Sequence, residues 1–590
     1  MTLQDSVQAS IYKYFEDNGI ERCGLQFQST KKEFKGELTL VTFPLTRFIK
    51  KKPEEIGEEL GDYLAKTNQN IAGYNVVKGF LNLETEDEFW LEYLNELYDN
   101  KSLGLKENEN PKEILVEYSS PNTNKPLHLG HLRNNFLGFS VANILEYAGN
   151  GVKKVQIIND RGIHICKSML AWQRFGDGET PESSGLKGDK LVGKYYVAFD
   201  KAYKEEIATL MTEGKTEEEA KKEAPILLAA QEMLVKWEQK DEQVWALWKR
   251  MNGWVYSGFD VTYDTIGVSF DKLYYESETF HLGKEKVLEG LASGIFYQKE
   301  DGSIWVDLED VGMDHKLLLR SDGTAVYITQ DIGTAIHRLH DFPELNSVIY
   351  TVGNEQDYHF KVLFEVLKRL GYAWAENCFH LSYGMVDLPS GKMKSREGTV
   401  VDADDLAAEM QATAQKITEE QGKLEHLQDE DKEALYKNIG MGALKYYLLK
   451  VDPKKRLMFD PTESIDFQGN TGPFVQYTHA RIKSILTKAN KELSAVNTDL
   501  HISEQEREIL VKLYDFPNMI QEAAKAYSPA LVANYTYDLV KSYNSFYQST
   551  PILKDDNKIV MNFRLVMSQK VAECIKQSLN LLGIVAPDSM

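Results

Sequence analysis

Apolar and polar residues between positions 113 and 158 follow one another in the order that a βαβ unit produces. Residues 113–118 form a short apolar run typical of a buried strand, residues 132–147 carry apolar side chains at helical spacing, and residues 152–158 predict a second strand. A polar turn, Ser-Ser-Pro-Asn, follows the first strand. Strands joined in this way run parallel, so the pattern predicts a ligand site at their carboxyl ends, where the polar turn lies.

A second half of the sheet is predicted far downstream, with a strand at residues 347–353 and a helix at residues 358–370. The sheet is therefore expected to be assembled from two separated parts of the chain. Between them, residues 170–260 are rich in Glu, Lys and Ala, which favours a helical insertion. We interpret the tryptophans of the insertion, at positions 237, 245, 248 and 254, as core packing rather than as a ligand cage.

The two ends of the chain differ from this α/β region. Residues 1–105 combine helical patterns with a strand-like stretch at 37–43 and end in a polar linker, which predicts a small α+β domain. From about residue 400 onward almost every segment has helical periodicity. The predicted organisation is an N-terminal α+β domain at 1–105, an α/β domain with a Rossmann-type parallel sheet at 106–400, a helical connecting segment at 401–460 and an all-α bundle at 461–590.

Composition and charge narrow the class of protein. The chain has 590 residues, of which 42% are hydrophobic and 27% charged, as in folded multidomain proteins. The first residues lack a basic segment followed by an apolar run, no stretch is long enough for a membrane span, and the four cysteines form no zinc-binding cluster. A cytoplasmic protein with reduced thiols is expected. The formal charge of −22 argues against indiscriminate nucleic-acid binding but permits a local basic surface.

The sharpest chemical signal is the sequence Pro-Leu-His-Leu-Gly-His-Leu-Arg at residues 126–133, where a helix is predicted to begin directly after the first strand. His128 and His131 are three residues apart, so both reach one side of the first helical turn, where free N–H groups and the helix dipole favour phosphate. Gly130 leaves room between them for a flat base. Histidine pairs at this spacing also bind metals, and the motif alone leaves that alternative open.

A second phosphate-type element is the segment Pro-Ser-Gly-Lys-Met-Lys-Ser-Arg-Glu-Gly-Thr at residues 389–399. This glycine-bounded cationic loop, with Lys392, Met393, Lys394 and Ser395 at its centre, can close on a triphosphate and stabilise the leaving pyrophosphate. If the loop stood alone, we would interpret it as a basic surface turn.

Together, the two elements resemble the paired signatures of class I aminoacyl-tRNA synthetases, and the segments around them resemble the arginyl-tRNA synthetases in particular. The supporting segments occur in the same order along most of the chain. They are Val-Glu-Tyr-Ser-Ser-Pro-Asn at 116–122, Tyr-Ile-Thr-Gln-Asp-Ile-Gly at 327–333, Gly-Asn-Glu-Gln-Asp-Tyr-His-Phe at 353–360, Asp-Phe-Gln-Gly-Asn-Thr-Gly-Pro at 466–473, Gln-Tyr-Thr-His-Ala-Arg at 476–481, and the C-terminal residues 582–590.

The resemblance implies an ATP-dependent ligase with L-arginine and tRNA(Arg) as partners and a monomeric state. The arginine carboxylate would attack the α-phosphorus of ATP in line, giving arginyl-adenylate and pyrophosphate, before transfer to the 3′-terminal adenosine of the tRNA. No residue becomes covalently attached, so His128, His131 and the lysines would act by placing positive charge and hydrogen bonds. Mg²⁺ should accompany the triphosphate, although no dedicated protein cage for a metal is predicted.

The resemblance also assigns roles to individual positions. A guanidinium offers five donors in a planar fork and is best matched by carboxylates, which Glu117 and Asp331 supply. For Asp331 and Tyr327, helix capping and core packing are the structural alternatives. The implied arginine-binding set is Glu117, Ser119, Asn122, Tyr327, Asp331 and Gln356. The implied ATP-binding set is His128, Gly130, His131, Asn134, Gly353, Gln356, His359, Met393 and Ser395.

The cationic loop departs from the general class pattern, because Ser395 stands where most members have a second lysine. Members of the arginine family commonly lack that lysine and carry one shortly before the histidine turn, a position that Lys125 occupies here. The implied catalytic set is therefore His128, His131, Lys125 and Lys392, with Lys394 as a further candidate.

The helical C-terminal part resembles the anticodon-binding bundle of the family, and residues 1–105 resemble the amino-terminal domain that contacts the tRNA elbow. Aromatic side chains in the bundle could stack on unpaired bases. Most aromatic residues of a helical bundle belong to its core, so for any single one that alternative stays open. The implied RNA-binding set is Tyr477, Arg481, Phe546, Tyr547 and Met590.

Two other functions are compatible with parts of the pattern. A small-molecule nucleotidyltransferase shares the chemistry of the histidine turn, but such enzymes are usually compact. A non-catalytic RNA-binding relative would be expected to have lost one of the two phosphate elements, and both are present. The discriminating experiment is ATP–pyrophosphate exchange with arginine, with and without tRNA, because activation in this family often requires tRNA.

Overall fold

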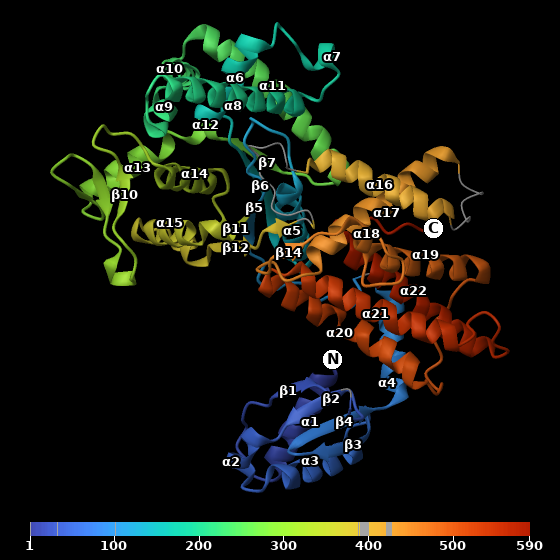
Figure 1. Cartoon of the computed structure of the whole chain (residues 1–590). Helices are drawn as coiled ribbons and strands as arrows, with labels where there is room; N and C mark the ends of the chain where they lie inside the picture. The colour runs from blue at the N-terminus through green and yellow to red at the C-terminus, as the bar shows by residue number, and fades with distance from the viewer. Residues whose placement is uncertain (1, 32, 101, 388, 390–400, 421–427) are drawn as a thin grey trace. The chain divides into compact units, whose positions relative to one another are not determined.

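The structure is a computed structural model that describes the chain except residues 1, 32, 101, 388, 390–400 and 421–427 (Figure 1). The chain divides into two compact units. Unit 1 contains Met1–Lys106, Arg481–Asn518 and Asp538–Cys574, and unit 2 contains Glu107–Ala480, Met519–Tyr537 and Ile575–Met590. Among the described residues, no helix combines the length and the apolar character that crossing a membrane requires.

The N-terminal part of unit 1 combines helices with short strands. Its elements are α1 (Leu3–Asp17), β1 (Phe27–Ser29), β2 (Leu38–Val41), η1 (Phe43–Leu45), α2 (Thr46–Ile49), α3 (Pro53–Thr67), β3 (Ile71–Val77), β4 (Phe80–Thr85) and α4 (Asp87–Asp99). The strands form one antiparallel sheet in the order β1-β2-β4-β3. Helices α1 and α3 bury Val7, Phe15 and Leu60 in one core with Leu40 and Leu81 of the sheet. The α+β prediction for this region is confirmed.

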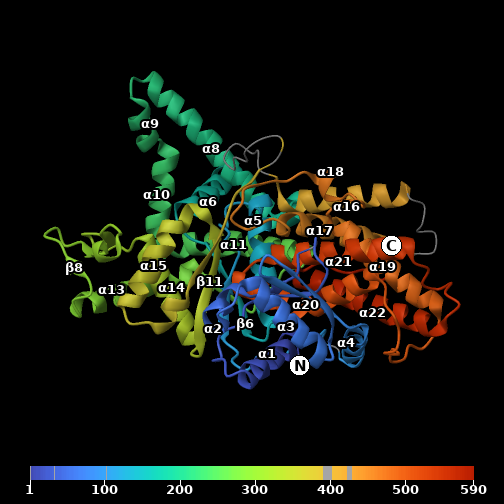
Figure 2. The ribbon, with the colours of Figure 1, turned by 90° about the horizontal axis from the view of Figure 1, so that it is seen from below.

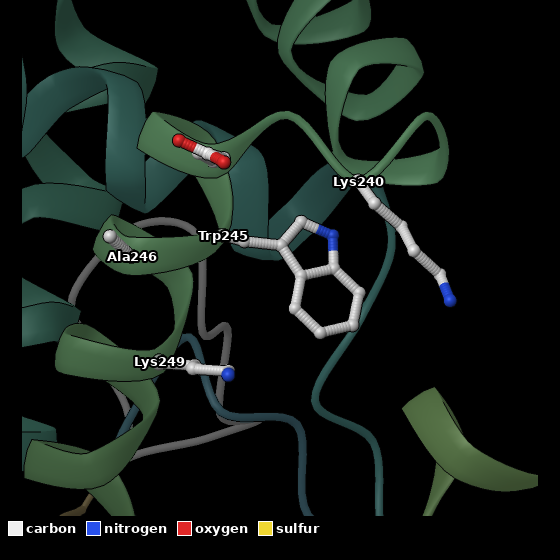
Figure 3. A pocket seen from close by; sticks show the side chains of 5 residues that line it. Lys240, Trp245, Ala246 and Lys249 are labelled. Carbon is white, nitrogen blue, oxygen red and sulfur yellow. The ribbon is translucent and has the colours of Figure 1, made fainter.

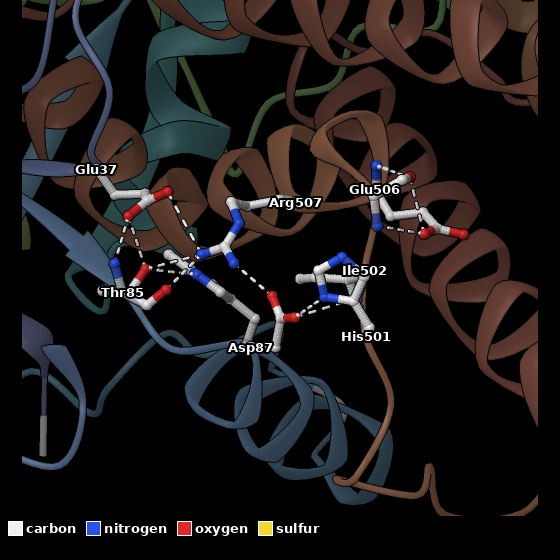
Figure 4. A network of polar contacts seen from close by, with 9 residues as sticks. Glu37, Thr85, Asp87, His501, Ile502, Glu506 and Arg507 are labelled. Atoms are coloured by element: carbon white, nitrogen blue, oxygen red, sulfur yellow. Dashed lines mark hydrogen bonds and ion pairs between the residues drawn. The ribbon is translucent and has the colours of Figure 1, made fainter. Parts of the chain in front are cut away.

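Charged side chains from distant parts of the sequence meet within unit 1 at the start of α4 (Figure 4). Arg507 donates from Nη1 to the carbonyl oxygen of Thr85 at 2.7 Å and forms an ion pair with Asp87. The other carboxylate oxygen of Asp87 lies 2.6 Å from Nδ1 of His501. Local sequence patterns do not reveal such contacts, because they join residues more than four hundred positions apart.

Four long helices make up the C-terminal part of the chain, as the sequence predicts. They are α19 (Gly472–Ala489), α20 (Glu504–Ala526), α21 (Pro529–Ser549) and α22 (Lys558–Leu581), and their residues are divided between the two units. Pro473 lies in the first turn of α19, and Pro551 follows the end of α21. Proline is compatible with these positions because its missing N–H is not needed in the first turn of a helix or beyond its end.

Unit 2 is built on a five-stranded parallel sheet in the order β12-β11-β5-β6-β7, with pairing along every neighbouring pair. The strands are β5 (Glu113–Glu117), β6 (Gly151–Ile158), β7 (Lys272–Tyr275), β11 (Leu345–Gly353) and β12 (Phe379–Tyr383). Val348 of β11 pairs with Leu115 of β5, so the strand of the second predicted half lies directly beside the first half. The prediction of a sheet assembled from two separated parts is confirmed.

Helices cover both faces of this sheet (Figure 1). Helix α5 (Leu129–Tyr147) packs on one face, where the Tyr118 side chain contacts Gly138. Helices α14 (Tyr327–Asp341) and α15 (Asp357–Arg369) share the opposite core with Leu115 of β5. Side chains of a strand alternate between its faces, so Glu117 points to the same side as Leu115, towards α14. The sheet thereby separates the helix of the histidine motif from the helix that carries Asp331.

The helical insertion is also present. It comprises α6 (Ile163–Phe175), α7 (Pro181–Ser184), α8 (Gly188–Thr212), α9 (Glu217–Glu223), α10 (Pro225–Glu238) and α11 (Glu242–Ile266), seen to one side of the sheet in Figures 1 and 2. Trp237 and Trp248 are buried, as the core interpretation requires. Trp245 instead lines a shallow hollow between Lys240 and Lys249, whose ammonium groups lie 5.9 and 5.5 Å from its ring (Figure 3).

The remaining elements of unit 2 surround the sheet. They are α12 (Glu276–Thr279), α13 (Leu282–Ala292), β8 (Tyr297–Gln298), β9 (Ile304–Val306), η2 (Glu309–Val311), β10 (Lys316–Leu319), η3 (Asn354–Gln356), η4 (Ala373–Asn377), β13 (Val386–Asp387), α16 (Ala403–Glu420), α17 (Asp429–Leu449), β14 (Leu457–Met458) and α18 (Pro461–Ser464). Strands β8, β9 and β10 form a small antiparallel sheet, and β13 pairs in parallel with β14.

Packing of α5 on the sheet requires a glycine at position 138. A Cβ at Gly138 would lie 2.3 Å from Cβ of Tyr118, whereas one at Gly253 of α11 would meet nothing within 4 Å. We expect Gly138→Ala to destabilise the protein by about 1–3 kcal/mol, because the helix must move off the strand. The matched Gly253→Ala should be neutral or stabilising by up to about 1 kcal/mol, since alanine favours helix. Thermal unfolding checks both variants, and equal melting temperatures would contradict this packing.

Candidate active site

The two histidines of the 126–133 motif lie against each other at the start of α5. His128 is the extended residue that precedes the helix, and its backbone N–H donates to Nδ1 of His131 at 3.1 Å. The imidazole rings stack with their centroids 3.8 Å apart. A Cβ at Gly130 would meet only the His128 ring, so the backbone beside the pair is accessible to a flat ligand. The motif starts a helix, as the sequence predicts, and phosphate binding there stays a prediction.

Both histidines are uncharged at neutral pH in this structure. Burial and the Lys125 ammonium lower the pKa of His128 to about 3. Burial, His128 and Lys125 lower the pKa of His131 well below its usual value. A neutral imidazole can donate a hydrogen bond but brings no charge. In this structure the positive charge at the turn therefore comes from Lys125, and charge placement by the histidines on a bound phosphate stays a prediction.

The structure describes the chain before and after the cationic loop, but not residues 390–400 of the loop itself. Its predicted site residues, Lys392, Met393, Lys394 and Ser395, lie outside the described residues, so their roles stay predictions. After the loop, residues 401–403 run antiparallel to residues 127–129, with backbone N–H···O distances of 3.2 and 2.9 Å. The chain that follows the loop is thus joined directly to the histidine turn.

Asn134 of α5 ties the strand ends to the helix of the histidines. Its Oδ1 accepts the backbone N–H of Ser119 at 2.6 Å, and its Nδ2 donates to Thr351 O at 2.6 Å and to Tyr383 Oη at 3.2 Å. These partners belong to the end of β5, to β11 and to β12. Both ends of the amide thus have protein partners, and the ATP contact of Asn134 stays a prediction.

The turn after β5 is tightly held. Ser119 is fully buried and has a left-handed backbone with φ of 63°, which is uncommon for a residue with a side chain and typical of constrained functional turns. Its Oγ lies 2.7 Å from Oη of Tyr263 in α11. The Ser119 hydroxyl therefore already has a partner. Asn122 lies further along the turn, is exposed, and forms a parallel bridge with Asn159, which follows β6.

Carboxylates gather where the parallel strands end. Glu117 is the last residue of β5, Asp160 follows β6, and Glu276 follows β7. Asp331 of α14 is close enough to both Glu117 and Glu276 to raise their pKa values. Parallel strands place all their carboxyl ends at one edge of the sheet, which explains why residues so far apart in sequence form one acidic group.

Asp160 has a positioning role within this group. It accepts hydrogen bonds from the N–H and Oγ of Ser277 at 2.8 and 2.7 Å and from Oη of Tyr256 at 2.8 Å. Burial raises the pKa of Asp160, and these donors act against that rise. The carboxylate thereby fixes the chain beside Glu276.

Glu276 is a further candidate site residue, which the sequence analysis did not name. Burial raises the pKa of Glu276 to about 7, Arg161 acts against this, and Asp160 and Asp331 add to it. An acid whose pKa is shifted into the neutral range at a strand-end edge is a functional-site candidate. The signal in the sequence was the short run Lys-Leu-Tyr-Tyr at 272–275 followed directly by an acidic residue.

Asp331 and Tyr327 are available at the surface of α14. Oδ2 of Asp331 lies 2.6 Å from Nε2 of His359 in α15. The Tyr327 side chain is 80% exposed, so the alternative that Tyr327 belongs to the core is wrong. Gly353 ends β11, and Gln356 lies exposed in η3 just before α15. The structure thus brings Asp331 together with His359.

Glu117 has a partner that the sequence analysis also missed. Glu117 is 6% exposed, and its carboxylate forms an ion pair with Arg338 of α14, whose side chain is 1% exposed. An arginine in the apolar face of an amphipathic helix gives no local signal of its function. Contact with substrate by Glu117 stays a prediction.

The predicted RNA-binding residues have different environments. In unit 1, Arg481 donates to the side chain of Asn544, and its guanidinium lies 5.3 Å from the ring of the exposed Tyr547. Phe546 is fully buried in the same unit and has no ring face available to a base, so it is withdrawn from the RNA-binding set. In unit 2, Tyr477 and the last residue, Met590, are half-buried.

The metal-binding alternative for the histidine pair gains no support. Within the described part of the chain, one group of three possible metal ligands occurs, formed by Asp307, Glu309 and His315. It lies around η2 and the start of β10, away from the histidine turn in the chain. Nδ1 of His131 already accepts a backbone N–H.

Two protein-family models match parts of the chain between residue 93 and its last residue. The model described as tRNA synthetases class I (R), catalytic domain, matches residues 93–460. The model described as DALR anticodon binding domain matches residues 475–590. The chain belongs to the class I arginyl-tRNA synthetase family.

Full-length relatives of the family are similar to the chain from end to end. An arginine–tRNA ligase of Flavobacterium psychrophilum is 57% identical over 600 residues, covering 100% of this chain and 99% of the relative. One from Bacteroides fragilis is 53% identical over 598 residues, covering 100% of both. The solved arginyl-tRNA synthetase of Thermus thermophilus superposes with a TM-score of 0.79 at 26% identity over 100% of both chains. The arginyl-tRNA synthetase resemblance is thereby confirmed.

Proposed function

We propose that the strand-end edge of unit 2 is where L-arginine is activated by ATP before transfer to tRNA(Arg). Arginine–tRNA ligase is the activity of this chain, which matches the family throughout its length. The observation that carries the assignment of the site is the group formed by Glu117, Glu276 and Asp331 at the edge where the histidine turn also begins. Three carboxyl groups in one place suit a substrate with two cationic groups.

Arginine recognition follows from this distribution of charge. We assign Asp331 and Glu276 to the guanidinium, because two carboxyl groups from different elements can accept several donors of its planar fork. Glu117 at the end of β5 is assigned to the α-ammonium. The exposed Tyr327 and Gln356 would close the pocket from the solvent side. Opposite charge supplies attraction, and the planar fork supplies selectivity over lysine.

We place ATP at the same edge of the sheet, on the face that α5 covers. His128 and His131 are neutral and would donate hydrogen bonds to phosphate oxygens, together with the free N–H groups of the first turn of α5. Lys125 supplies charge beside them, with Lys392 or Lys394 of the loop as further cations. The donors at the turn are nitrogen atoms, whereas Mg²⁺ prefers oxygen. Mg²⁺ therefore enters as part of the ATP substrate, held by phosphate oxygens.

The chain's own residues position the reactants rather than form covalent intermediates. A carboxylate oxygen of arginine attacks the α-phosphorus, the new carbon–oxygen–phosphorus linkage forms, and the bond to the bridging oxygen of pyrophosphate breaks. Negative charge grows on the phosphate oxygens, where the imidazole and lysine donors stabilise it. A hydroxyl of the terminal ribose of tRNA then attacks the carbonyl carbon of the adenylate, the arginyl ester forms, and the acyl–phosphate bond breaks with release of AMP. Fixed placement of both substrates by the sheet edge supplies much of the rate.

For tRNA we propose contacts on the anticodon-binding part of the chain. Tyr547 has an exposed ring with the Arg481 guanidinium over it, and such a pair can take part in stacking on an unpaired base. Tyr477 and Met590 stay candidates. We further propose that the protein is a cytoplasmic monomer, as the family resemblance predicts.

The function is tested by ATP–pyrophosphate exchange in the presence of tRNA(Arg). Arginine should support exchange, whereas L-citrulline, which has the same shape without the positive charge, should be rejected by at least about a hundredfold because the carboxylates would lose their cation. Exchange with lysine, or exchange with citrulline at a rate similar to that with arginine, would overturn the assignment of the pocket.

Lys125 gives a direct test of the charge at the histidine turn. We expect Lys125→Ala to lower the rate of exchange about 10²–10³-fold, as removal of one preorganised stabilising group does. Lys125→Arg should retain part of the rate, and Lys201→Ala, an exposed lysine of α8, serves as the control. Near-normal exchange by Lys125→Ala would remove this residue from the mechanism.

Glu276 gives a test based on pH. Its carboxyl group has a pKa raised to about 7 by burial, and only the ionised form attracts a cation. In the wild type, kcat/KM for arginine should therefore rise as the pH rises through about 7, because this parameter follows ionisation of the free enzyme. Glu276→Gln should have a lower kcat/KM without that rise, and Glu278→Gln, on the exposed side of α12, should behave as the wild type. An unchanged pH profile in Glu276→Gln would contradict the assignment.

A further inference from the structure

Arg338 is a buried cation that the proposed reaction does not use directly. It lies near the end of α14, is 1% exposed, and donates from Nη2 to Oε2 of Glu117. Its guanidinium carbon lies 5.2 Å from the ring of Tyr274 in β7 and 5.6 Å from the ring of Tyr350 in β11. The guanidinium therefore lies against aromatic residues of β7 and β11 and points at the end of β5.

Within the described residues, charged and titratable groups surround the Glu117–Arg338 pair from α14, β11 and β7. Arg338 and Asp331 face Glu117 from α14, while Tyr350 of β11 and Tyr274 of β7 lie around the Arg338 guanidinium. Asp331 is negative and opposes ionisation of Glu117. Burial raises the pKa of Tyr350 and that of Tyr274 above the usual range, so both rings stay neutral. Among these groups, Arg338 is the cation that balances Glu117.

Burial and the charge of the partner act in opposite directions on the pKa of Glu117 and on that of Arg338. Burial lowers the pKa of Arg338, but the Glu117 carboxylate, Tyr350 and Tyr274 together raise it by more, so the guanidinium keeps its proton. Burial and Asp331 push the pKa of Glu117 upward, and Arg338 is the group that acts against them. A buried carboxylate without a partner takes up a proton instead of staying ionised. The charge at the end of β5 thus depends on Arg338.

We propose that Arg338 is a positioning residue for amino-acid binding, which holds Glu117 as a carboxylate at the strand end, where the α-ammonium of arginine binds. This inference rests on the proposed contact between Glu117 and that ammonium. Arg338 touches Glu117 and not the substrate. The planar fork of the Arg338 guanidinium fixes the plane of the Glu117 carboxylate and stabilises its charge. A lysine in place of Arg338 would do this only in part.

The test compares Arg338→Met and Arg338→Lys with the wild type by ATP–pyrophosphate exchange in the presence of tRNA(Arg). In Arg338→Met the unpaired Glu117 should be protonated at neutral pH, so KM for arginine should rise at least about tenfold while KM for ATP changes less than about twofold. Raising the pH from about 6 to about 8 should lower KM for arginine in this variant, because ionisation restores the anion. Arg338→Lys should recover part of the affinity without this extra pH dependence.

A matched control separates this role from simple loss of stability. Arg564 of unit 1 also forms a buried pair, with Nε 2.7 Å from Oε1 of Glu506, which is 3% exposed. Arg564→Met should lower the melting temperature, as Arg338→Met does, and leave the pH profile of KM for arginine as in the wild type. If Arg338→Met changes stability alone, with the KM values and their pH dependence unchanged, the positioning role is wrong.

Glu117→Gln distinguishes failure of this inference from failure of the proposed contact. A large rise in KM for arginine at all pH values in Glu117→Gln, combined with wild-type behaviour of Arg338→Met, would overturn only the role of Arg338. An unchanged KM for arginine in Glu117→Gln would overturn the contact between Glu117 and arginine itself. The double variant Arg338→Met, Glu117→Gln should have the same KM for arginine as Glu117→Gln, because removal of the carboxylate leaves Arg338 nothing to position.

Discussion

A carboxylate taken out of water needs a cation or hydrogen-bond donors, and this constraint organises the strand-end edge of unit 2. Glu117 lies opposite Arg338, and Asp331 lies 2.6 Å from His359. For Glu276, the positive charge of Arg161 does not offset the effect of burial, and the pKa of its carboxyl group is raised to about 7. The carboxyl groups at this edge are thus only partly balanced by protein cations. In the proposed function, the ammonium and guanidinium groups of arginine supply the remaining positive charge.

At the start of α5, where we propose that ATP binds, hydrogen-bond donors and charge come from different residues. His128 and His131 are buried next to Lys125 and are neutral, so they contribute directed donors while the lysine contributes charge. Asn134 uses its amide to bind the ends of β5, β11 and β12 to the same helix. The helix that presents the phosphate donors is therefore fixed to the strands that present the carboxylates. Chemistry between arginine and ATP requires such fixed relative placement.

The sequence predicts what is local and periodic in this protein. The two halves of the sheet and the helix start at His128 follow from spacing and side-chain chemistry. Glu276 was missed because β7 is short and follows a long helical insertion, so its place beside β6 is a tertiary fact. Phe546 and Tyr547 are neighbours in sequence, yet successive residues of a helix point in different directions, and only the fold decides which is buried.

A crystal structure of the protein with L-arginine bound tests the central claim most directly. The account predicts that the guanidinium contacts the carboxylates of Asp331 and Glu276, that the α-ammonium contacts Glu117, and that Glu117 keeps its ion pair with Arg338. Arginine bound away from the ends of β5 and β7, or bound there with its ammonium and guanidinium facing none of these carboxylates, would contradict it.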